Sequence, residues 1–116
     1  MAAKLYGADN APLKIQFITD PHYYSRKGGT EGKAYEKAEA KSQKVIKDSD
    51  LVIKAGFDLL CADTSTDIVV LAGDTTRDGE LASHAEFIEM LRDLKKRGKR
   101  VYVITATHDY RDGGVA

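Results

Sequence analysis

Three short runs of β-branched and aromatic residues, separated by long amphipathic segments, constrain the fold of this chain more than any other feature. The runs cover residues 14–19, 68–71 and 101–105, and their composition is typical of β-strands. Between them, in 34–60 and 81–94, apolar residues recur every three or four positions, which indicates helices with one buried face. Each intervening segment is long enough to return the chain parallel to the preceding strand. The sequence therefore predicts an α/β fold, a parallel β-α-β-α-β sheet layered with helices.

Polar residues mark where these helices are expected to divide or end. Residues 48–50 (Asp-Ser-Asp) interrupt the first helical segment and could split it in two. The second helix carries the basic residues 95–97 at its negative dipole end, and Gly98 follows as a stop signal. The continuous apolar run at 68–71 predicts a strand that is covered on both faces.

Length and composition favour one globular domain without a strong charge preference. The chain has 116 residues, with 18 Lys and Arg against 18 Asp and Glu, so no global basic field attracts nucleic acid or an anionic membrane. We treat 1–116 as a single domain, with 1–11 as a flexible leader. The single cysteine, Cys61, excludes an internal disulfide and is interpreted as a small buried hydrophobe.

No targeting or membrane signal is evident in the sequence. It has no run of 18 apolar residues and no basic start followed by an apolar stretch and a cleavage site. The default location is cytoplasmic, although residues 1–11 could equally be the trimmed front of an exported precursor.

Acidic and imidazole side chains follow the predicted strands. Asp20 and His22 come after the first strand, Asp74 after the second, and His108 and Asp109 after the third. Each of them alone is most simply a turn residue or a helix cap. Because the carboxyl ends of parallel strands meet at one edge of a sheet, the five are expected to converge. Mixed carboxylate and imidazole sets suit divalent ions from Mg²⁺ and Mn²⁺ to Fe²⁺ and Zn²⁺.

The order of these motifs resembles a known family. Asp20-x-His22, then Gly73-Asp74-x-x-x-x-Gly79, then His108-Asp109 are similar to the first three motifs of the calcineurin-like metallophosphoesterases. The similarity spans about residues 14–110. It implies half of a metallophosphoesterase sandwich, and a hydrolase of phosphate monoesters or diesters that uses two metal ions, drawn from Mn, Fe, Zn or Mg.

The resemblance also implies a role for each matching residue. Asp20 and His22 would hold the first metal and Asp74 would bridge both, while a hydroxide held by the metals attacks phosphorus. His108 would act as the general acid on the leaving-group oxygen. Asp109 would orient or polarise the His108 imidazole.

Two departures from the family pattern predict an incomplete site. Thr107 stands where the family has Asn, and a hydroxyl is a poorer donor for the second metal. The family also needs three further histidines after the third motif, whereas this chain has only His22, His84 and His108. His84 lies early in the second helix and is interpreted as a solvated or partly packed residue. We therefore expect the N-terminal portion of a phosphoesterase, inactive or weak as this chain alone.

Other functions stay open beside this one. One is a non-catalytic α/β binding or scaffold module that holds at most one divalent cation, and another is a flavodoxin-like or receiver-like acidic pocket for Mg²⁺. The sequence has no nucleotide-binding glycine loop and no serine-esterase elbow. Arg77, beside Asp74, is either a contact for a substrate phosphate or a solvated loop residue.

The expected partners follow from charge and from the size of the sheet. A phosphate ester is the expected substrate. Nucleic acid is not expected, since compensation of the helix dipole accounts for most of the basic stretch 95–100. No membrane segment is expected. A three-stranded sheet that lacks its usual cover predicts a homo-oligomer through the uncovered face or edge.

Overall fold

The computed structural model describes residues 12–41 and 46–110 of the chain. The predicted flexible leader, 1–11, lies outside this range. The order of strands and helices along the chain is β1 (Gln16–Thr19), a 3₁₀ turn (Arg26–Gly28), α1 (Lys33–Lys41), α2 (Ser49–Ala62), β2 (Ile68–Ala72), α3 (Leu81–Lys96), β3 (Arg100–Ile104) and α4 (Thr107–Tyr110). The predicted α/β class and the strand-helix-strand-helix-strand order are confirmed.

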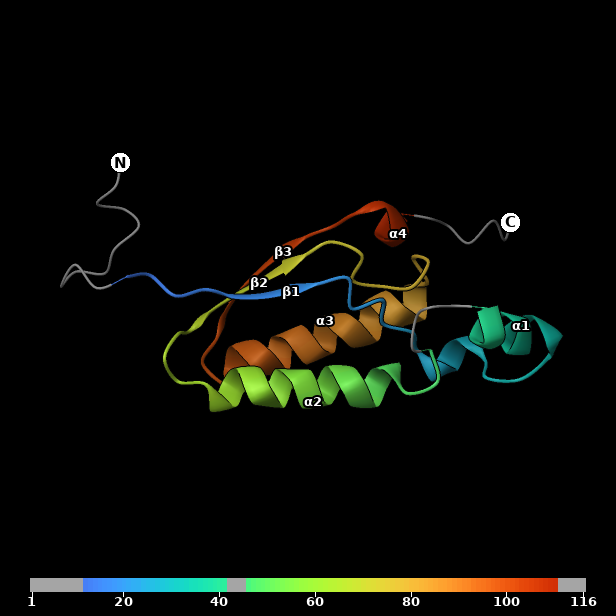
Figure 1. Ribbon diagram of the computed structural model, residues 1–116, viewed down its shortest axis with the longest axis horizontal. Coiled ribbons are helices and arrows are strands. Elements are labelled where there is room, and N and C mark those ends of the chain that lie inside the picture. Colours follow the sequence, from blue (N-terminus) through green and yellow to red (C-terminus); the bar gives the residue numbers. More distant parts are fainter. Residues whose placement is uncertain (1–11, 42–45, 111–116) are drawn as a thin grey trace.

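The strands form one parallel sheet in the order β1-β2-β3. Ile18 pairs with Leu71, and Leu71 pairs with Val103, so β2 is the central strand. With parallel strands in sequential order, right-handed crossovers bring both connecting helices to the same side of the sheet. Figure 1 shows this arrangement, with α2 and α3 side by side beneath the sheet and α1 beyond its end.

One face of the sheet is covered by helices and the other is open. Val69 and Leu71 face the helices and are fully buried. On the opposite face, Phe17 is 63% exposed and Tyr102 is 56% exposed, and Val70, which lies between them in the sheet, is only partly buried. The prediction that the 68–71 strand is covered on both faces is therefore wrong for the described residues. Its side chains alternate between the face covered by helices and the open face.

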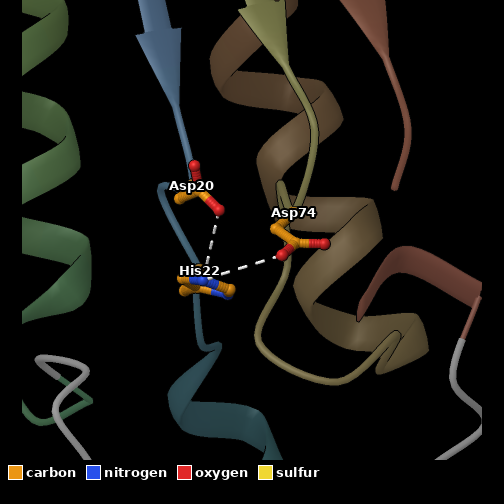
Figure 2. A group of neighbouring side chains, drawn as sticks. All are labelled: Asp20, His22 and Asp74. Atoms are coloured by element: carbon orange, nitrogen blue, oxygen red, sulfur yellow. Dashed lines mark ion pairs between the residues drawn. The ribbon is translucent and has the colours of Figure 1, made fainter. Parts of the chain in front are cut away.

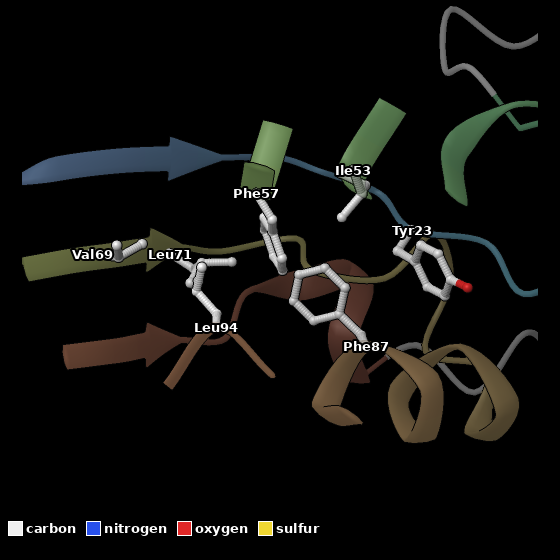
Figure 3. Close-up of a cluster of buried hydrophobic side chains, with 7 residues drawn as sticks. All are labelled: Tyr23, Ile53, Phe57, Val69, Leu71, Phe87 and Leu94. Carbon is white, nitrogen blue, oxygen red and sulfur yellow. The ribbon is translucent and has the colours of Figure 1, made fainter. Parts of the chain in front are cut away.

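The core lies between the sheet and the α2–α3 layer (Figure 3). Aromatic rings dominate it, with Phe57 and Phe87 at a centroid distance of 6.0 Å and Tyr23 and Phe87 at 5.9 Å. The cluster consists of Tyr23, Ile53, Phe57, Val69, Leu71, Phe87 and Leu94. The sequence-predicted hydrophobe Cys61 is half-buried and packs against this cluster.

The helix boundaries follow the polar signals in the sequence. The first helical segment does divide, because residues 46–48 are not helical and α2 begins at Ser49. The α3 helix ends at Lys96, and Gly98 adopts a φ of 99°, as expected of a stop residue. None of the helices in the described part of the chain is long and apolar enough to cross a bilayer.

Candidate metal centre

The loops that follow β1 and β2 are joined by backbone hydrogen bonds that extend the sheet ladder. The amide of Asp20 donates to the carbonyl of Gly73 at 3.2 Å, and the amide of His22 donates to the carbonyl of Asp74 at 3.0 Å. Directly after His22, the ring of Tyr23 enters the core, and its hydroxyl donates to Oε2 of Glu86 at 2.7 Å. Burial is the main cause that raises the pKa of Tyr23 well above its ordinary value, and this hydrogen bond is the second. The two loops are thus fixed to each other and to α3.

Backbone strain coincides with the predicted ligands. Asp20, His22 and Asp74 have φ values of 51°, 45° and 45°, and they are the non-glycine residues with positive φ in the described ranges. For L-residues this left-handed conformation costs roughly 1–2 kcal/mol each, least for Asp and Asn. Such strain persists only where the surrounding structure imposes it, and it concentrates at functional sites.

The left-handed turns bring three potential metal ligands together (Figure 2). Nε2 of His22 lies 3.8 Å from Oδ1 of Asp20 and 3.9 Å from Oδ2 of Asp74. One ligand atom from each residue lies within 4.8 Å of the other two. Donors that share an ion at about 2.1 Å lie at most about 4.2 Å apart. The donor set fits one divalent cation after shifts of under about 1 Å.

The cluster is enclosed on one side and open on the other. The side chains of His22 and Asp74 are each 16% exposed, whereas that of Asp20 is 62% exposed. A ligand could therefore reach the cluster on the side of Asp20.

His108 reaches the same edge of the sheet from the end of β3. Its backbone amide donates to Oδ1 of Asp74 at 3.0 Å, and its ring lies edge-on to that of His22 at a centroid distance of 5.0 Å. Nδ1 of His108 donates to Oδ1 of Asp78 at 3.1 Å. Asp78 is not among the residues singled out from the sequence, because no motif there indicates a contact with an imidazole 30 residues away.

Asp109 lies behind the site instead of beside the His108 ring. Asp109 is buried, with 7% of its surface exposed. Oδ1 accepts hydrogen bonds from Thr75 Oγ1 at 2.6 Å and from the amide of Thr76 at 2.8 Å, and Oδ2 accepts from the amide of Ala106 at 3.0 Å. Burial alone would raise the pKa of Asp109, but these hydrogen bonds outweigh it and lower the pKa to about 2. The Asp109 carboxylate ties the loop after β2 to the end of β3. Asp109 was expected to orient or polarise the His108 imidazole, and in the structure Asp78 contacts that ring at Nδ1.

Two further residues support this edge of the sheet. Gly73 has a φ of 85°, and a Cβ placed on it would lie 2.8 Å from Cβ of Ala106, so both conformation and space require glycine. Nε2 of His84 lies 3.0 Å from the backbone carbonyl of Asp109, which fixes α4 to α3. Because a carbonyl only accepts, this nitrogen carries the proton. His84 thus supports the site from α3, half-buried as predicted for a partly packed residue.

The other residues singled out in the sequence lie beside the cluster. Thr107 begins α4 and is exposed. Arg77 forms an ion pair with Asp78 at 3.0 Å.

No protein-family model matches the sequence, and a search of curated proteins finds no match. The resemblance to metallophosphoesterases is therefore carried by the three motifs alone.

Proposed function

We propose that Asp20, His22 and Asp74 bind one divalent cation, and that the chain contributes this half of a phosphoesterase site. The observation that carries the proposal is the meeting of two carboxylates and an imidazole from two strand ends within 4.8 Å. The left-handed backbone at all three positions supports it, because turns without a function seldom retain such strain.

His108 is the proposed general acid for the leaving group. A bound divalent cation would supply charge neutralisation for a phosphate ester and activation of water. Since Nδ1 of His108 donates to Asp78, we assign proton delivery to Nε2 of the same ring. The contact with Asp78 holds the ring in one orientation.

The absence of further histidines from the sequence favours weak hydrolysis by this chain alone. It has three histidines, of which His84 is engaged with α4. The second candidate function, a module that holds a single structural cation, is favoured by exposed Thr107 in place of an amide ligand. Turnover of bis-p-nitrophenyl phosphate near background, together with cation binding, is expected under both.

Calorimetric titration with Mn²⁺ tests the cation site. We expect one ion per chain, and at least tenfold weaker binding by Asp74→Asn, in which the amide oxygen can still accept from the amide of His108. Asp58→Asn is the matched control, because Asp58 is 69% exposed on α2 and pairs with Arg97. No binding by the wild type, or equal binding by wild type and Asp74→Asn, would contradict the proposal. Two tightly bound ions would contradict the expected incomplete site.

We also propose that a second copy of the chain covers the open face of the sheet. Its apolar side chains are between 40% and 63% exposed, namely Leu13, Ile15, Phe17, Tyr102 and Ile104. At roughly 200 Å² for a large side chain, of which about half is exposed here, they present on the order of 500 Å² per copy. Two such faces offer about 1,000 Å² in total, the lower limit for a specific interface. Packed sheet on sheet, the two copies would form a β-sandwich.

A further inference from the structure

An apolar groove adjoins the candidate metal centre. It has a volume of about 430 Å³ and lies between the segment after β1 and helix α2. Asp20 and His22 line it together with a set of apolar residues, Ile18, Pro21, Val52, Ile53, Gly56 and Phe57. In Figure 2, α2 (green) runs beside the segment that carries Asp20 and His22. A molecule held by a cation at the cluster could extend directly into this groove.

Gly56 gives the groove its depth. It lies in the middle of α2, where glycine costs roughly 1 kcal/mol relative to alanine. A Cβ built on Gly56 would meet no atom within 4 Å, so neither close packing nor backbone conformation requires glycine here. The missing side chain leaves space beside Ile53 and Phe57.

Apart from Asp20 and His22 at its end, the groove offers a ligand only the hydroxyls of Thr19 and Ser49 as side-chain hydrogen-bonding groups. Its serine, Ser49, accepts from the amide of Tyr24 at 3.0 Å and donates to the carbonyl of the same residue at 3.2 Å. A sugar placed there would leave several hydroxyls unpaired, and the loss of their hydration is costly. An aromatic ring or short alkyl chain has no such requirement.

We infer that this groove binds the organic group of a phosphate ester, and that the substrates are esters of aromatic or short aliphatic alcohols. The inference rests on the proposed cation at Asp20, His22 and Asp74, which would hold the phosphate. Without a cation, the carboxylates of Asp20 and Asp74 repel the phosphate, so binding of the ester depends on the metal. The groove then distinguishes an aryl ester from free phosphate.

Calorimetry with phenyl phosphate and inorganic phosphate, each in saturating Mn²⁺, tests the inference. We expect wild-type chain to bind phenyl phosphate at least tenfold more tightly than inorganic phosphate, as burial of one ring supports. Gly56→Leu fills the groove and is expected to abolish the preference, while Mn²⁺ affinity changes by less than twofold. Ala55→Leu adds the same side chain at the neighbouring exposed position of α2, outside the groove, and should preserve the preference.

A second variant keeps the test independent of the folding of Gly56→Leu. Val52 is 54% exposed, so Val52→Gln is expected to fold and to weaken phenyl phosphate binding at least threefold with inorganic phosphate binding unchanged. If Mn²⁺ binds but the two phosphates bind equally, the groove inference is wrong and the cation site stands. If Mn²⁺ does not bind, both proposals are wrong.

Discussion

Replacement of Asp109 by asparagine tests whether this residue is a structural brace. Its carboxylate accepts from Thr75 and Thr76 on one oxygen and from the amide of Ala106 on the other. An asparagine amide fits the same space but has one NH₂ group in place of an oxygen. One of the donors now facing this carboxylate would then meet another donor. A buried hydrogen bond to a charged acceptor is lost, and the amide that made it is left unpaired.

Two estimates, which rest on the same hydrogen bonds, give the size of the effect. Hydrogen bonds to charged groups contribute about 1.5–3 kcal/mol, and an unpaired buried donor costs about as much as its desolvation. The pKa of Asp109 falls from 3.8 to about 2 on folding, which corresponds to about 2 kcal/mol of stability for the ionised form. We therefore expect Asp109→Asn to lower the free energy of unfolding by about 2–3 kcal/mol at pH 7.

Urea unfolding from pH 7 to pH 2 measures both the loss and its pH dependence. Because the folded pKa of Asp109 lies below the unfolded value, its contribution is fully present above pH 4 and is lost as the pH falls toward 2. The difference between wild type and Asp109→Asn should narrow across this window. Asp93→Asn, at a 65% exposed position on α3, is the control and should change stability by under about 0.5 kcal/mol. A difference that is absent at pH 7, or unchanged between pH 4 and pH 2, would refute the assignment.

Three further predictions concern the frame of the site and the open face. His84→Ala removes the hydrogen bond that fixes α4 to α3 and should lower unfolding free energy by about 1 kcal/mol in urea titrations. Gly73→Ala sets a Cβ against Ala106 at a positive φ and should destabilise by at least about 2 kcal/mol in the same assay. In sedimentation velocity the wild-type chain should be dimeric at micromolar concentration, and Phe17→Lys with Tyr102→Lys should be monomeric; a monomeric wild type would contradict association through the open face.

The sequence was sufficient for the topology because the signals that set it are local. The periodicity around Ile53 and Phe57 placed one face of α2 on the core, and the parallel order followed from the lengths of the crossovers. Which face of β2 is exposed could not be predicted from the sequence pattern. Val69 and Val70 are both apolar, yet one is fully buried and the other partly exposed, because sequential crossovers put both helices on one side. An uninterrupted apolar strand has the same sequence whether its second cover comes from this chain or from elsewhere.

The candidate ligands were predictable in their position along the chain, whereas their individual contacts were not. Parallel strand ends meet, so Asp20, His22 and Asp74 lie together as expected. Which carboxylate contacts the His108 ring depends on how α4 starts and where its side chains point. In the structure, Asp78 contacts the His108 ring, and Asp109 points inward to Thr75. Side chains of consecutive helix residues point about 100° apart, so being next to His108 in the sequence does not bring the Asp109 carboxylate to its ring.

The buried hydrogen bonds of Asp109 and the backbone strain at the ligands are energetically linked. Three residues in the left-handed region cost on the order of 3 kcal/mol together, comparable to the contribution expected from the Asp109 network. That network joins the loop carrying Asp74 to the strand end carrying His108, so it opposes relaxation of the strained turns. Asp109→Asn should therefore weaken Mn²⁺ binding severalfold although Asp109 is not among the ligands, whereas Asp93→Asn should leave it unchanged. If Asp109→Asn is destabilised but its Mn²⁺ affinity is unaltered, Asp109 stabilises the fold without affecting the cation site. The strained turns would then keep their conformation without the Asp109 hydrogen bonds.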